Sequence, residues 1–163
     1  EPMTQIIKAR PLTAAAFAPF GEVLDASGTP DRLINAGKCG RFHDRARLDF
    51  ADARAGISIF KSQCFSLPFR LDLVERHPEG SQAFICMTSD PFLVVVAADN
   101  AGTPATPLAF ITDGAQAINI HRNVWHGVLT PLSGPGLFAV VDRIGSTRNL
   151  EEHHFTAAFA VQA

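Results

Sequence analysis

The segment ERHPEGSQAF, Glu75 to Phe84, decides how this chain is organised. Glu75 and His77 are two residues apart, so a β-strand would point both side chains to one face. The following Pro-Glu-Gly breaks that strand, because proline removes a ladder donor and glycine weakens a strand interior. Gln82 then opens an uncharged run, QAFICM, which is typical of a buried strand. We therefore predict a carboxylate, an imidazole and an amide beside an apolar wall.

A second polar cluster, HRNVWH, occurs in the second half of the chain and ends at His126. We predict that His126 joins Glu75, His77 and Gln82 in one small polar site. The competing interpretation of His77 is an exposed residue at a strand end, since proline follows it. Glu75 and Gln82 beside it favour the site.

Short strands separated by turns predict an all-β fold. The run FLVVVAA, residues 92–98, is apolar without alternation and so predicts a strand that is buried on both faces. Asp113-Gly114 is a hairpin-type turn, and LFAVVDR, residues 137–143, is a final strand. Helical periodicity is almost absent, which favours an antiparallel sandwich or barrel.

The two ends of the chain give weaker signals. IIKARPL resembles an edge strand, and Thr13 is a suitable N-cap for a short helix that Pro19 ends. The C-terminal HHFTAAFAV is interpreted as a tail, with His153 and His154 on the surface.

Composition limits the classes of function. The chain has 163 residues, of which 47% are hydrophobic and 18% charged, which suits a single globular domain over residues 1–163. A net charge of −2 without a basic cluster argues against nucleic acid and membrane surfaces as partners, and favours a small-molecule substrate. Three cysteines without CxxC spacing, and no signal peptide or membrane span, predict a cytoplasmic protein with reduced thiols.

The segment LINAGKCGRFHD, residues 33–44, is too polar for a core strand and too patterned for a linker. We expect it to reach the site and to offer Asn35, Arg41 and His43 to a substrate. His43 has a simpler alternative, as a turn residue bonded to Asp44.

Several separated motifs together resemble one known family. ERHPEGSQAF, FLVVVA, FITDG, INIHRNVWH and VVDR, in this order, are similar to the ureidoglycolate lyase family of allantoin and purine catabolism, formerly called ureidoglycolate hydrolase. The resemblance implies a cupin-type double-stranded antiparallel β-barrel (jelly roll) with a few short helices. It also implies a homodimer and an amidine-lyase type of carbon–nitrogen lyase that splits ureidoglycolate into glyoxylate and urea.

Comparison with cupins implies a metal site. Cupins place two histidines, a glutamate and a last histidine around a metal, and Glu75, His77, Gln82 and His126 fall at those places. Two imidazoles and one carboxylate can hold a divalent transition metal, whereas an amide oxygen is a poorer ligand. The resemblance therefore suggests weakly held nickel or manganese and no organic cofactor.

Cleavage of ureidoglycolate needs a base for the hydroxyl proton and an acid for the departing urea nitrogen. His121 is the candidate acid or base, although its odd separation from His126 requires a bend or bulge near Asn123. It can equally be a solvent-facing strand histidine. Lys61 and Arg122 are further catalytic candidates.

The substrate carboxylate asks for a fork of donors, which arginine supplies better than lysine. Arg41, Arg122 and Arg143 are the candidates, but Arg122 can instead pair with Asp142. Trp125 is expected to line the pocket or the core.

Two other classes of function stay open. One is a cupin enzyme of different chemistry, a metal-dependent isomerase or oxygenase, which iron or manganese without ureidoglycolate turnover would favour. The other is a non-enzymatic cupin that binds a small carboxylate, which the absence of both metal binding and turnover would favour.

Overall fold

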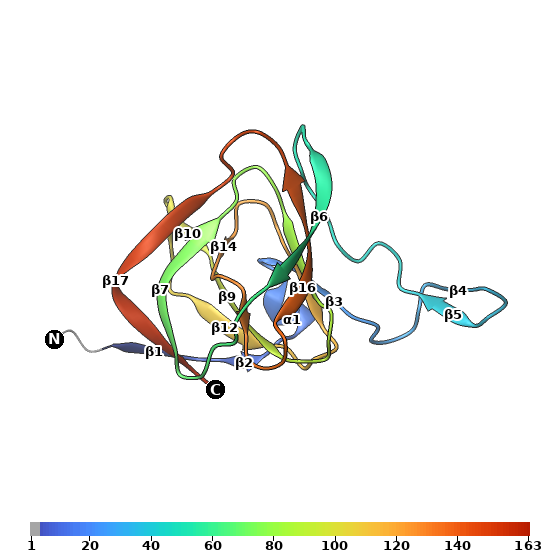
Figure 1. The fold of residues 1–163 in the computed structure, drawn as a ribbon, viewed down its shortest axis with the longest axis horizontal. Helices are drawn as coiled ribbons and strands as arrows, with labels where there is room; N and C mark the ends of the chain where they lie inside the picture. Colours follow the sequence, from blue (N-terminus) through green and yellow to red (C-terminus); the bar gives the residue numbers. More distant parts are fainter. Residues whose placement is uncertain (1–3) are drawn as a thin grey trace.

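Two β-sheets enclose a common core in the computed structural model, which describes residues 4–163 (Figure 1). The first three residues of the expected 1–163 domain lie outside the described range. The larger sheet has the strand order β1-β17-β7-β14-β9-β12-β2, and β15 pairs with β9. Its strands are β1 (Gln5–Lys8), β2 (Arg10–Pro11), β7 (Phe69–Arg76), β9 (Phe92–Ala97), β12 (Leu108–Ile111), β14 (Trp125–His126), β15 (Thr130–Pro131) and β17 (Glu151–Gln162).

The smaller sheet has five strands in the order β3-β13-β8-β16-β6. They are β3 (Gly21–Leu24), β6 (Arg54–Lys61), β8 (Gln82–Cys86), β13 (Ala117–Ile120) and β16 (Leu137–Ile144). Together the sheets form a nearly closed barrel, which confirms the expected cupin-type β fold. Within residues 4–163 there is a single α-helix, α1 (Ala14–Phe17), rather than a few, and no helix there is long and apolar enough to cross a membrane.

Strand β9 is buried on both faces, as its unbroken apolar sequence predicted. Val94 and Val96 belong to the main core, in which side chains from both sheets meet. The intervening Leu93 and Val95 belong to a second cluster, which Val161 of β17 helps to form. The outer strands β1 and β17 therefore cover the back of the barrel wall.

Helix α1 packs against the main core. The Thr13 hydroxyl accepts a hydrogen bond from the Ala16 amide, which confirms the predicted N-cap. Phe17 is fully buried, and its ring lies 6.1 Å from the rings of both Phe20 and Phe110.

The predicted C-terminal tail is wrong, because residues 151–162 form the long strand β17. It pairs antiparallel with β7 and parallel with β1, with a shift of register between His154 and Phe159. The shift interrupts the alternation of inward and outward side chains by which a strand is recognised in a sequence, which explains why the strand was not predicted. His154 is exposed as expected, whereas His153 is partly buried against the Trp125 ring.

A two-stranded hairpin projects from the barrel on the side of the five-stranded sheet (Figure 1). It consists of β4 (Arg32–Ile34) and β5 (Cys39–Arg41), which pair only with each other. We call residues 31–47 the arm. A second small hairpin, β10 (Asp99–Asn100) with β11 (Thr103–Pro104), joins β9 to β12.

Truncation of Phe17 tests the role of α1 in the core. Phe17→Ala should lower the free energy of unfolding by about 3–5 kcal/mol, because it leaves a cavity between packed rings. Urea denaturation measures this change. Leu108→Ala, at an exposed leucine, is the control and should change stability far less; equal effects of the two substitutions would contradict the assignment of Phe17 to the core.

Candidate metal centre

Glu75, His77 and His126 converge although the chain separates them. Glu75 is in β7, His77 directly follows that strand, and His126 in β14 is the cross-strand partner of Glu75. One ligand atom from each residue lies within 4.8 Å of the others, and the two imidazole rings are 5.1 Å apart. Three of the four predicted metal ligands are therefore brought together at the end of two neighbouring strands.

Both imidazoles are fixed in the tautomer that a metal ligand needs. Nδ1 of His77 lies 2.7 Å from the Asn149 carbonyl oxygen, and Nδ1 of His126 lies 2.8 Å from that of Gly127. A carbonyl only accepts, so each Nδ1 carries a hydrogen and each Nε2 presents a lone pair. Both Nε2 atoms are buried and have no hydrogen-bond partner among residues 4–163. This donor set, two imidazole nitrogens and a carboxylate, fits a divalent transition metal.

Burial also sets the charge of the cluster. It lowers the pKa of His126 to about 4, and the neighbouring His77 adds to this effect. His126 is therefore neutral at pH 7, as metal binding requires. Burial raises the pKa of Glu75 because it disfavours an isolated carboxylate, a cost that a bound cation would offset.

Gln82, the fourth predicted ligand, holds a carboxylate that the sequence did not single out. Its Nε2 donates to Oδ2 of Asp142 over 3.1 Å, and the two residues are cross-strand partners in β8 and β16. Its Oε1 is buried without a partner among residues 4–163. Burial raises the pKa of Asp142, against smaller opposing effects of Gln82 and His77.

Asp142 was missed because it stood next to an arginine and was considered only as a possible partner of Arg122. The available signal was the alternation in LFAVVDR, in which Phe138, Val140 and Asp142 share one face. Phe138 and Val140 are core residues, which places Asp142 on the inner face of the barrel.

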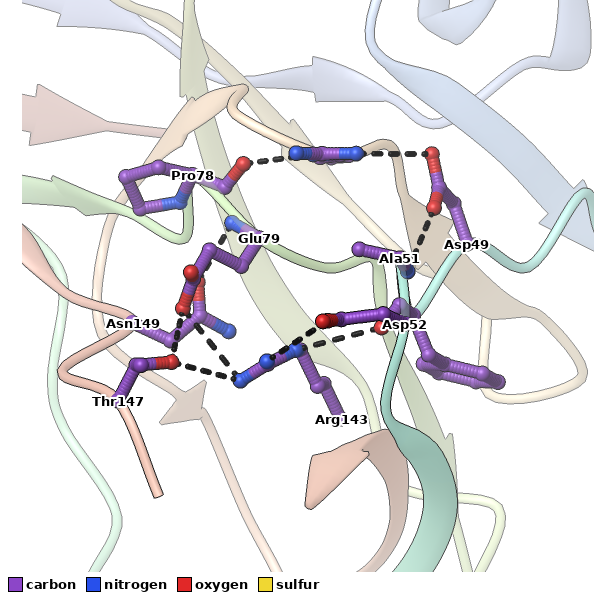
Figure 2. Close-up of polar contacts among 10 residues, drawn as sticks. Asp49, Ala51, Asp52, Pro78, Glu79, Arg143, Thr147 and Asn149 are labelled. Atoms are coloured by element: carbon purple, nitrogen blue, oxygen red, sulfur yellow. Dashed lines mark hydrogen bonds and ion pairs between the residues drawn. The ribbon is translucent and has the colours of Figure 1, made fainter. Parts of the chain in front are cut away.

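Arg143, the next residue, points to the opposite face and holds three segments together (Figure 2). Its side chain is only 6% exposed and forms ion pairs with Asp52 and Glu79. It also donates to the Phe50 carbonyl and to the Thr147 hydroxyl. These contacts occupy the guanidinium, so the structure gives the predicted substrate arginine a supporting role.

The same network reaches the metal cluster through Asn149. The Thr147 hydroxyl donates to Glu79 Oε2 over 2.5 Å, and the Glu79 amide donates to Asn149 Oδ1 over 2.7 Å. The Asn149 carbonyl then accepts from His77. Asn149 thus ties the turn after β7 to the ring of a metal-ligand candidate.

His121 lies on the outer face of the smaller sheet, not in the barrel. The chain does bend at Asn123, which has a φ of 66°, but β13 ends before it, at Ile120. His121 Nε2 contacts Glu22 Oε2. Burial alone would raise the pKa of Glu22, but hydrogen bonds from Asn119, the Arg47 amide and His121 lower it. A polar cavity of about 420 Å³ lies beside His121.

The other predicted catalytic residues also lie away from the cluster. Arg122 donates to the Pro78 carbonyl over 2.6 Å and faces Asp49, so the suggested pair with Asp142 is wrong. Lys61 is exposed at the end of β6, five positions along that strand from Gly56, the partner of Asp142.

The predicted pocket residues are likewise separated from the cluster. Trp125 belongs to the second apolar cluster, donates to Asp99 and carries the Arg76 guanidinium 4.2 Å above its ring. Arg41, Asn35 and His43 are exposed on the arm.

The pH dependence of stability tests the burial of neutral His126. Its pKa falls from 6.5 unfolded to about 4 folded, so between these values only the unfolded chain takes up the proton. His126 should therefore lower the free energy of unfolding by roughly 3 kcal/mol as pH falls from 6.5 to 4. Denaturation of metal-free protein at several pH values, compared with His126→Asn, isolates this contribution. His154→Asn, at an exposed histidine, is the control and should have the same pH dependence of stability as the wild type. If His126→Asn also has the wild-type pH dependence, the burial of a neutral His126 is contradicted.

Substitution of Asn149 tests the support of His77. Asn149→Ala keeps the backbone carbonyl that accepts from His77 but removes Oδ1, which accepts from the Glu79 amide and so holds that carbonyl in place. It should therefore weaken Ni²⁺ binding to the metal-free protein by about 10-fold, the lower end of the effect of losing the outer contact itself. Calorimetric titration with Ni²⁺ measures the affinity, and ring nitrogen chemical shifts report the His77 tautomer. Asn149→Asp keeps an acceptor and should restore binding, and the exposed Asn100→Ala is the control. Wild-type affinity and tautomer in Asn149→Ala would contradict the role.

Comparison with known proteins is consistent with this geometry. A family model described as "Ureidoglycolate lyase" matches residues 4–162. The chain is similar to a protein of Rhodobacter capsulatus named ureidoglycolate lyase, with 58% identity over 93% of this chain and 95% of the relative. A Rhizobium meliloti protein named ureidoglycolate lyase 2 is 50% identical over 94% of this chain and 95% of its own length. A Mesorhizobium japonicum protein named ureidoglycolate lyase is 51% identical over 95% of this chain and 96% of its own length. The chain therefore belongs to the ureidoglycolate lyase family.

Proposed function

We propose that this protein cleaves ureidoglycolate to glyoxylate and urea, as a carbon–nitrogen lyase of the amidine-lyase type in cytoplasmic allantoin and purine catabolism. Membership of the family supports the reaction. The observation that carries the proposal is the partly buried cluster of Glu75, His77 and His126. Its ligand atoms lie within 4.8 Å of one another, and two of its imidazole nitrogens are buried without a partner among residues 4–163. A cluster of this kind is costly to bury without a function.

Glu75, His77 and His126 would hold a divalent metal, with nickel or manganese as our proposal. Such an ion supplies Lewis acidity, which lowers the pKa of a hydroxyl bound to it. Gln82 would orient Asp142 through its amide nitrogen, and this contact leaves its Oε1, the atom that an amide can offer to a metal, without a partner among residues 4–163.

We assign the proton transfer to Asp142. The substrate hydroxyl loses a proton while its oxygen forms the new carbonyl, and the carbon–nitrogen bond breaks with its electrons leaving on urea. The urea nitrogen then needs a proton. Asp142 is on the inner face, and its raised pKa suits a group that first accepts this proton and then returns it. His121, Lys61 and Arg122 do not share that face or that position, so the role passes from them to Asp142.

We also propose that the protein acts as a homodimer, as the resemblance to the family implies. The projecting arm is the feature of the chain that supports association.

The reaction is tested by measuring glyoxylate, urea and ammonia from ureidoglycolate with added Ni²⁺ or Mn²⁺. We expect equal amounts of glyoxylate and urea and no ammonia. His126→Ala should abolish turnover, with His154→Ala as the matched control. Asp142→Asn should lower kcat by about 10²–10⁴-fold and leave Ni²⁺ affinity close to the wild-type value.

Three results would count against this function. Full turnover in His126→Ala would remove the metal-centre hypothesis. Ammonia in place of urea would indicate a hydrolase. Metal binding without turnover would favour a cupin of different chemistry.

A further inference from the structure

The hairpin of the arm pairs with no other strand of its own barrel, and the arm is hydrogen-bonded to the barrel at its last residue, Arg47, which contacts Glu22 and Asn119. Strands β4 and β5 form a separate two-stranded sheet, and an isolated hairpin is only marginally stable in water. Leu33, in β4, is 66% exposed. An exposed leucine on a hairpin that pairs with no other strand favours packing of the arm against a further surface.

The arm also carries an unbalanced pair of cations. Arg32 and Arg41 are direct cross-strand partners, and like charges in such positions destabilise a hairpin. The nearby Asp31 is bound to Arg45 at 2.9 Å. Among residues 4–163, neither Arg32 nor Arg41 forms an ion pair with a carboxylate. This pair of guanidinium groups is suited to binding an anion.

Strand β6 lies on the same side of the molecule as the arm (Figure 1), and it carries exposed apolar side chains. On the outer side of the five-stranded sheet Ile57 is 75% exposed and Ile59 is 59% exposed. Both are in β6, which is the unpaired edge of that sheet. Ile85 and Met87, on and just after β8, extend the exposed apolar surface. An exposed apolar edge of this kind normally marks an interface.

The charges of the arm and of the rest of the chain are complementary. Residues 31–47 contain five basic and two acidic residues, a formal charge of +3, which leaves −5 on the remainder of a chain whose total is −2. A second copy of this chain therefore offers the arm an apolar face on a barrel whose net charge is opposite to that of the arm. One twofold axis satisfies both copies at once, because each gives an arm and receives one.

We propose that two copies associate through their five-stranded sheets and exchange arms, and that Arg41 of each arm binds the substrate carboxylate at the metal cluster of the other copy. The second part rests on the proposed function. Of the three arginines that the sequence offers for the carboxylate, Arg122 and Arg143 are engaged in contacts within the barrel wall. Arg41 is free to serve, but on an arm that extends away from its own barrel. Exchange of arms would place Arg41 of each copy against the barrel of the other copy.

Sedimentation equilibrium tests the association. The wild type should be a dimer, whereas Leu33→Asp on the arm and Ile57→Asp on the sheet should each weaken the dimer at least 10-fold without loss of β-structure in circular dichroism. Leu108→Asp, at an exposed leucine of the other sheet, is the matched control and should remain a dimer. A monomeric wild type, or a dimer that neither substitution weakens, would overturn the proposal.

Mixing of inactive variants tests the exchange. Arg41→Ala lacks the donor, and His126→Ala lacks the metal cluster, with His77→Ala as a second cluster variant. Each alone should be inactive, but a 1:1 mixture should regain about one quarter of wild-type turnover, because half of the dimers are mixed and each has one complete site. Arg54→Ala is the control within the same barrel, since Arg54 is an exposed arginine at the start of β6.

Three outcomes would refute the role of Arg41: full activity of Arg41→Ala, loss of activity in Arg54→Ala instead, or no recovery in the mixture. If the wild type releases no urea, the proposed function fails by itself. The arm is then judged by calorimetric titration of the Ni²⁺-loaded proteins with oxalate. The mixture should regain about one quarter of the binding sites, and no recovery would again refute exchange.

Discussion

Two partly buried hydrogen bonds from imidazole Nδ1 to backbone carbonyls are the constraint on which the candidate metal centre depends. They fix His77 and His126 in one tautomer and leave both Nε2 atoms as acceptors without a partner in the described chain. A buried acceptor without a partner is unfavourable. The fold maintains it here because β7 and β14 are adjacent and because Asn149 and Gly127 place their carbonyls behind the rings. The cluster therefore presents a set of donors that is suited to a cation.

The support of this arrangement comes from the outer face of the barrel. Arg143 connects the segment before β6, the turn after β7 and the loop before β17, and its contacts continue through Glu79 to Asn149 (Figure 2). A nearly buried guanidinium that is paired with two carboxylates is costly to disrupt, because removal of a partner leaves a buried charge uncompensated. The two neighbours Asp142 and Arg143 thus lie on opposite faces of one strand, Asp142 toward the inside of the barrel and Arg143 toward the segments that it connects.

Strand parity decides which polar residues belong to the centre. In β13 the core residues Ile118 and Ile120 face inward, so Asn119 and His121 face outward. The same rule puts His126 inside and Trp125 outside in β14. Residues that are close in sequence therefore take part in separate structures. The polar segment 121–126 contributes His126 to the candidate metal centre and His121 to the outer cavity.

The sequence by itself determined the all-β class, the buried strand β9, the N-cap at Thr13 and the convergence of Glu75, His77 and His126. These features depend on local periodicity, on turn residues and on the order of short motifs along the chain, and each of these can be recognised from neighbouring residues. Only the tertiary structure decided the pairing of Gln82 with Asp142, the outward position of His121, the supporting role of Arg143 and the strand formed by residues 151–162. Each of these depends on which strand lies beside which and in what register. Those choices follow from contacts between distant residues, and neither spacing nor composition encodes them locally.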